Sequence, residues 1–130
     1  MSGLPFILVC DDTKNIATSI VFILQSGGYR AQAVSAAMDC VAVARKDRPA
    51  LIIMDIMMPG MDGAMASELM KENPELASIP IILLSAMPED EVQEKAQASG
   101  AAGYLLKPFK KDTLLGIVRK FVPSAPPKEA

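Results

Sequence analysis

The sequence predicts an α/β fold of five β/α repeats, in which helices cover both faces of a parallel sheet to form a three-layer sandwich. Three observations predict it. Short apolar runs that suit buried strands alternate with longer segments whose apolar residues recur at helical spacing. Glycine and proline separate most of these segments. Charged or hydroxyl-bearing residues follow most of the apolar runs, at the place where a strand would end.

Five apolar runs are the predicted strands. The third run, from Ala50 to Met54, contains no charged residue, as expected for a central strand that is buried on both faces. The second run is more polar and is expected near an edge of the sheet. The five strands are expected at residues 6–10, 29–34, 50–54, 79–84 and 102–106.

A helix is expected after each strand. Ser35 and Asp112 are the expected N-caps of the second and fifth helices. Pro88 and the acidic residues after it suit the start of the fourth helix. The pair Asp62-Gly63 is expected to form a turn in which Gly63 takes a positive φ. The five helices are expected over residues 13–27, 35–48, 64–72, 88–100 and 112–122.

One domain is expected, over residues 1–122. A chain of 130 residues matches the common size of a single domain and is long enough to bury a core. Residues 123–130 contain three prolines and little that could pack, so we expect a tail or linker stub there. The sequence leaves open whether the domain stands alone or belongs to a longer protein.

Composition excludes several classes of function. The chain has no histidine, which excludes Ser-His-Asp triads, histidine-ligated zinc and a histidine phosphoacceptor. Cys10 and Cys40 are expected to be buried free thiols, although a disulfide stays open. The net charge of −2 argues against nucleic-acid binding. No stretch approaches the roughly 20 apolar residues of a membrane span, and the first residues do not resemble a secretory signal, so we expect a cytoplasmic protein.

Five polar side chains are expected at one edge of the sheet. Asp11 and Asp12 follow the first strand, and Asp55 ends the third. Ser85 ends the fourth strand and Lys107 follows the fifth. Because right-handed crossovers bring the carboxyl ends of parallel strands to the same edge, these residues should share one rim, where ligands bind in such sheets.

Three acids, one hydroxyl and one ammonium suit phosphoryl transfer. Acids that lie close together repel one another and need a cation, and oxygen ligands without thiolate or imidazole favour Mg²⁺, with Mn²⁺ as a substitute. A carboxylate in such a site can attack a phosphoryl group as a nucleophile. The lysine and the hydroxyl can then stabilise the phosphoryl oxygens. The sequence therefore predicts an aspartyl phosphate on Asp55.

Several short motifs, in order along the chain, make a specific set. They are Val9-Cys10-Asp11-Asp12, Met54-Asp55, Pro59-Gly60-Met61-Asp62-Gly63, Leu84-Ser85-Ala86 and Gly103-Tyr104-Leu105-Leu106-Lys107-Pro108-Phe109. With them, the chain from Phe6 to Val122 resembles the CheY-like receiver domains of two-component response regulators. The resemblance implies a flavodoxin-like (βα)5 sheet of order 2-1-3-4-5. It also implies a signalling switch, not an enzyme, that takes a phosphoryl group from a sensor histidine kinase or a histidine phosphotransfer protein.

The same resemblance implies a metal site. Asp12 and Asp55 would ligate Mg²⁺ directly, Met57 through its backbone carbonyl, and Asp11 through a water molecule.

It also implies a switch. Ser85 and Lys107 would contact the phosphoryl group on Asp55, and Tyr104 would swing inward when Ser85 is drawn toward the phosphate. The face formed by the fourth helix, fifth strand and fifth helix would then bind a target protein. The Lys107-Pro108 bond is expected to be cis, since X-Pro bonds tolerate cis at modest cost.

Other interpretations of these residues stay open. Asp11 and Asp12 could cap the first helix, Ser85 could cap the fourth, and Tyr104 could serve packing alone. A haloacid-dehalogenase-like phosphatase is disfavoured because it needs Asp-x-Asp after the first strand. A flavodoxin-like nucleotide binder is disfavoured because Asp11-Asp12 would repel a phosphate. The kinase, the target and a phosphorylation-dependent homodimer are not decided by the sequence.

Overall fold

The structure is a computed structural model that describes residues 4–123 of the chain. It confirms the predicted alternation of strands and helices. The strands are β1 (Phe6–Cys10), β2 (Arg30–Val34), β3 (Leu51–Asp55), β4 (Ile81–Ser85) and β5 (Gly103–Leu106). The helices are α1 (Lys14–Ser26), α2 (Ala37–Asp47), α3 (Gly63–Lys71), α4 (Glu89–Ser99) and α5 (Lys111–Phe121).

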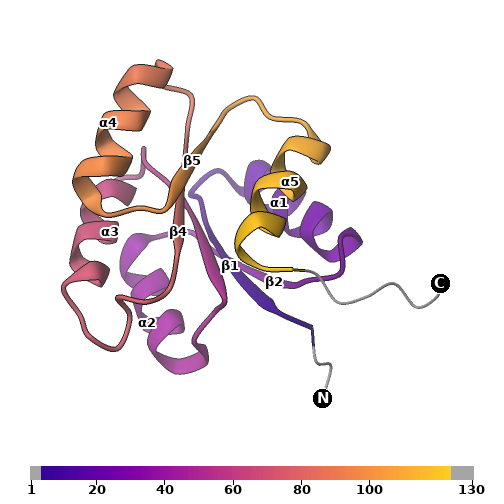
Figure 1. Ribbon diagram of the computed structural model, residues 1–130, viewed down its shortest axis with the longest axis horizontal. Coiled ribbons are helices and arrows are strands. Elements are labelled where there is room, and N and C mark those ends of the chain that lie inside the picture. Colours follow the sequence, from indigo (N-terminus) through magenta and orange to yellow (C-terminus); the bar gives the residue numbers. More distant parts are fainter. Residues whose placement is uncertain (1–3, 124–130) are drawn as a thin grey trace.

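All five strands form one parallel sheet of order β2-β1-β3-β4-β5, as the resemblance implied. The more polar second strand lies at an edge, as expected, and β3 lies at the centre. Helices α2, α3 and α4 cover one face of the sheet, and α1 and α5 cover the other (Figure 1). The chain is therefore a three-layer sandwich.

The core consists of two apolar layers, one on each face of the sheet. Side chains alternate between the layers along each strand, so that Leu8 packs under α2 to α4 and Ile7 packs under α1 and α5. Every residue of β1, β3 and β4 is buried. Burial on both faces explains why these strands read as continuous apolar runs. It also leaves the end of β3 little freedom to move.

Two predicted helix caps are wrong. The N-cap of α2 is Ala36, not Ser35, and the N-cap of α5 is Lys110, not Asp112. Both capping residues have extended backbone and make no side-chain capping hydrogen bond. Asp112 instead lies in the first turn of α5, where a carboxylate interacts favourably with the positive end of the helix dipole. The backbone conformation, and not the nearest polar residue, decides where each helix begins.

The expected positive φ at Gly63 is also wrong, because Gly60 takes it in this loop, at φ 82°. Gly63 is the first residue of α3, and Asp62 is its N-cap, accepting a hydrogen bond of 2.8 Å from the N–H of Met65. A Cβ on Gly63 would lie 2.2 Å from the backbone oxygen of Asp55. Glycine is therefore needed here because α3 packs directly against the end of β3.

Both cysteines are free and buried, as expected. The Cys10 thiol donates to the sulfur of Met58 at 3.5 Å. Hydrogen bonding with Cys10, together with burial, raises the pKa of the Cys40 thiol. Among residues 4–123, no helix combines the length and the apolar character needed to cross a membrane. The predicted tail lies outside the described residues from position 124 onward, so the domain boundary at residue 122 stays a prediction.

We expect Gly63→Ala to lower the free energy of unfolding by about 1–3 kcal/mol, because the added methyl group overlaps the backbone of β3. Gly116 offers a matched control, since it lies exposed inside α5 with nothing within 4 Å of an added Cβ. Gly116→Ala should raise the free energy of unfolding by roughly 0.5–1 kcal/mol. Urea denaturation of both variants measures the two effects. Equal stability of Gly63→Ala and the unmodified protein would show that the close contact is not there.

Candidate functional site

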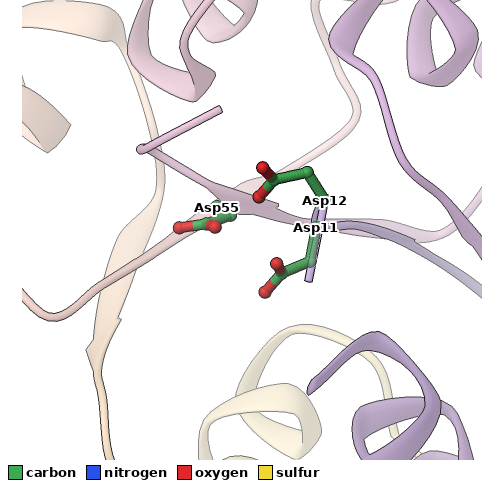
Figure 2. A group of neighbouring side chains, drawn as sticks. All are labelled: Asp11, Asp12 and Asp55. Atoms are coloured by element: carbon green, nitrogen blue, oxygen red, sulfur yellow. The ribbon is translucent and has the colours of Figure 1, made fainter. Parts of the chain in front are cut away.

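Three carboxylates meet at the carboxyl edge of the sheet. Asp11 and Asp12 follow β1, and Asp55 is the last residue of β3. Each offers one oxygen, and these oxygens lie within 4.8 Å of one another (Figure 2). Asp11 and Asp55 are only 1% and 3% exposed, whereas Asp12 is exposed. The predicted convergence of these acids on one rim is what the structure shows.

The ammonium group of Lys107 lies beside the acid cluster. The residue follows β5 directly, and its Nζ lies 3.3 Å from Oδ2 of Asp11 and 3.4 Å from Oδ2 of Asp55. Its backbone N–H donates to the carbonyl of Ser85 at 2.8 Å, which ties it to the end of β4. The Lys107-Pro108 bond is cis, as the resemblance implied. One ammonium against three carboxylates leaves the site with excess negative charge.

The surroundings of Asp55 shift the pKa of its carboxyl group. Burial and, second, the nearby charge of Asp11 raise its pKa to about 6. The Lys107 ammonium and the N–H of Met57, which donates to Oδ1 at 3.4 Å, act in the opposite direction on this pKa. Asp55 is therefore ionised at neutral pH but takes up a proton under mildly acidic conditions.

The donor set fits a hard cation. Oδ1 of Asp11 accepts a hydrogen bond of 2.9 Å from the N–H of Thr13, which closes a turn before α1 begins. Oδ2 of Asp11 is buried and accepts no hydrogen bond, although it forms an ion pair with Lys107. A buried carboxylate oxygen without a hydrogen-bond donor needs an explanation, and a bound ion is one. All three acids offer oxygen only, which Mg²⁺ prefers over softer ligands.

Ser85 is the last residue of β4 and is fully buried. The residue before it pairs with Asp55 in the sheet, so Ser85 lies on the same rim as the acids. Its Oγ accepts a hydrogen bond of 3.0 Å from the N–H of Met87. Ser85 is not the N-cap of α4, because that position belongs to Pro88.

Tyr104 lies on β5 and is half-buried. The hydroxyl donates to Oε2 of Glu89, at the start of α4, over 2.8 Å. This hydrogen bond is the first cause of a raised pKa at Tyr104. The sequence did not predict Glu89 as a contact of Tyr104. Glu89 is one of three acids in the first turn of α4, and no sequence pattern distinguishes it as the partner of a tyrosine 15 residues away.

Met57 is 63% exposed in the loop between β3 and α3. Its N–H faces Asp55, as described above. Its side chain lines a groove between this loop and α4, together with Met58, Met87 and Lys95. The structure thus places all seven residues singled out from the sequence at the carboxyl edge or on β5, with Asp11, Asp12, Asp55 and Lys107 in one cluster.

The chain is similar to proteins of one family throughout. Residues 7–119 match the model of the response regulator receiver domain. Protein PilG of Pseudomonas aeruginosa is 35% identical over 126 residues, which cover 95% of this chain and 92% of PilG. Protein PilH of the same organism is 30% identical over 109 residues, covering 84% of this chain and 90% of PilH.

A solved structure shares the fold. The chemotaxis protein CheY4 of Vibrio cholerae superimposes with a TM-score of 0.86 at 28% sequence identity, covering 92% of this chain and all of that chain. The sheet order, the acids at its carboxyl edge and the match over residues 7–119 agree with one another. This chain therefore belongs to the receiver domains of two-component response regulators.

Proposed function

We propose that this receiver is the phosphoacceptor of a two-component phosphorelay and that Asp55 takes the phosphoryl group. The proposal rests chiefly on one observation: the Asp55 carboxylate ends the central strand and faces the Lys107 ammonium at 3.4 Å, with two further acids beside it. A nucleophile, a cationic group for phosphoryl oxygens and a cation-binding set are thus in reach of one another.

The proposed reaction uses these groups. An oxygen of Asp55 attacks the phosphorus of a phosphohistidine on the donor protein, so that an O–P bond forms while the N–P bond breaks and the imidazole leaves. Lys107 binds a phosphoryl oxygen throughout, and the Ser85 hydroxyl donates to another. The protein's part is to orient these groups and to stabilise charge, as in other phosphoryl transfers.

Asp12, Asp55 and the backbone carbonyl of Met57 would hold Mg²⁺, with Asp11 acting through a water molecule, and Mn²⁺ has the same preference for oxygen ligands. When bound, the metal neutralises charge on the phosphoryl oxygens. Two observations support this assignment: the excess negative charge of the site, and the buried Oδ2 of Asp11, which accepts no hydrogen bond.

The response is a change on the α4–β5–α5 face. A phosphoryl group on Asp55 draws the Ser85 hydroxyl toward itself, and Tyr104 leaves Glu89 and turns inward. A target protein then binds the altered face. The chain accordingly acts as a signalling switch that catalyses its own phosphorylation and slow dephosphorylation. We place it in the cytoplasm, where a histidine kinase obtains its phosphoryl group from ATP.

The phosphodonor protein is proposed to dock on a groove between α1 and the loop after β5. This groove adjoins the site, because Lys107 forms part of its lining. Apolar side chains dominate the rest of it, including Ile16, Ile23 and Phe109. An apolar groove beside the nucleophile suits a helix of a sensor histidine kinase or histidine phosphotransfer protein that carries the phosphohistidine.

Incubation with Mg²⁺ and a small-molecule acyl phosphate should add one phosphoryl group, detected by intact-protein mass spectrometry. Asp55→Asn should abolish the addition because the nucleophile is lost. Asp62→Asn is the matched control, since asparagine keeps the capping hydrogen bond to Met65 and lies on the same loop. Labelling of Asp55→Asn, or catalytic turnover of a phosphomonoester by the unmodified protein, would count against the receiver chemistry and in favour of a phosphatase.

Mg²⁺ affinity should rise with pH and level off above the Asp55 pKa of about 6. Below that pKa the metal must displace a proton from the carboxyl group, so affinity should fall by up to about tenfold per pH unit. Titration calorimetry near pH 5 and pH 7, in two buffers of different ionisation enthalpy, measures both affinity and proton release. Asp55→Asn should bind more weakly and release no proton. Affinity that does not change between these pH values would contradict the assignment of Asp55 as a ligand.

Ile16→Glu should slow phosphoryl transfer from a histidine kinase at least tenfold while leaving labelling by an acyl phosphate unchanged, because only the protein donor needs the groove. Phe22→Glu on the same helix is the control: its side chain is 71% exposed and does not line this groove. Rates are compared by following radiolabelled phosphoryl transfer. Equal loss with both donors would mean that Ile16 supports the site itself and not the docking of a partner.

A further inference from the structure

A second apolar surface lies on α2 and α3. Three of the large exposed apolar side chains belong to it: Met38 on α2, 58% exposed, and Met65 and Leu69 on α3, 54% and 43% exposed. The two helices are neighbours on the same face of the sheet (Figure 1). Clusters of exposed apolar side chains on adjacent elements are characteristic of interaction sites. The proposed phosphorylation chemistry does not use this surface.

A groove of about 450 Å³ runs between these helices. Its lining includes Met38, Val41 and Arg45 from α2, and Leu69 and Glu72 from the end of α3. We define these residues, together with Met65, as the α2–α3 surface. Methionine is well suited to such a place because its flexible side chain adapts to a partner.

The α2–α3 surface has the same order of residue types on both helices. Met38, Val41 and Arg45 are spaced i, i+3, i+7 along α2. Met65, Leu69 and Glu72 are spaced i, i+4, i+7 along α3 and its C-cap, which is Glu72. Both helices follow parallel strands with right-handed crossovers, so they run in the same direction. Each therefore presents apolar residues first and a charge at its end.

The two charges at the ends of these rows, Arg45 and Glu72, have opposite sign. Arg45 and Glu72 are exposed at the same end of the groove, one on each rim. Neither forms an ion pair within residues 4–123, where the ion pairs belong to Lys107. One rim of the groove thus carries a positive group and the other a negative group, and both can form ion pairs with another molecule.

We propose that the α2–α3 surface is the interface of a symmetric dimer. A two-fold axis parallel to the helices places α2 of one subunit on α3 of the other. Arg45 then faces Glu72 of the partner subunit, and Val41 and Met38 face the apolar side of that same helix. The operation makes each contact twice, as an isologous interface requires. The opposite charges of Arg45 and Glu72 favour a second copy of this chain as the partner, because the positive rim of one copy is complementary to the negative rim of the other.

Sedimentation velocity over a wide range of protein concentration tests the dimer. The measurements use unphosphorylated protein in EDTA, so that a dimer that depends on phosphorylation or metal does not contribute. The unmodified protein should show a concentration-dependent monomer–dimer equilibrium. Leu69→Glu should shift it at least tenfold toward monomer, and Phe22→Glu, an equally drastic change on α1, should leave it unchanged. Circular dichroism confirms that both variants are folded.

Charge reversal tests the proposed pairing. Arg45→Glu alone and Glu72→Arg alone should each weaken dimerisation at least tenfold, because like charges then face each other twice. The double variant Arg45→Glu/Glu72→Arg should restore the dimer, since the pair is exchanged and not removed. A monomer at every concentration, disruption by Phe22→Glu, or failure of the double variant to recover would each overturn the proposal.

Discussion

The main constraint in this structure is the burial of the Asp55 carboxylate beside a second acid. Burial and the nearby charge of Asp11 both disfavour the ionised form of Asp55. Together they outweigh the opposing effect of Lys107 on the pKa of Asp55. A carboxylate held in this way is poorly solvated, and its charge is only partly compensated by Lys107. A cationic ligand in the cluster would relieve that cost, which supports the proposed metal site.

The rest of the fold holds this carboxylate in place. Apolar layers on both faces bury β3 along its whole length, and β1 and β4 fix its register from either side. Gly63 lets α3 begin directly against the last residue of the strand. Lys107 reaches the acids because its backbone is bound to the end of β4. The position of the charge is thus determined by backbone packing, which a change of one exposed side chain does not disturb.

The sequence predicted the elements that depend on repeated patterns. Continuous apolar runs predicted β1, β3 and β4. The right-handed crossover rule predicted that Asp11, Asp55 and Lys107 lie at the same edge of the sheet. Prediction from the sequence failed where a single residue has several structural uses. Asp112 looks like a cap in sequence but lies in the first turn, and Gly63 looks like a turn residue but serves close packing. The contact between Tyr104 and Glu89 joins separate elements, so no local pattern could reveal it.

Two parts of the domain, helix α3 and the side chain of Tyr104, differ in how firmly they are held. Helix α3 is bound at its middle and at its end: Ser67 donates to the carbonyl of Ser99, and Lys71 donates to two carbonyls of the following loop, at 3.0 and 2.8 Å. The hydroxyl of Tyr104, by contrast, makes one solvent-exposed hydrogen bond, to Glu89, which water can replace at little cost. In the proposed switch, the α3 side of the α2–α3 surface would therefore keep its shape on phosphorylation, while Tyr104 on the α4–β5–α5 face would be free to move.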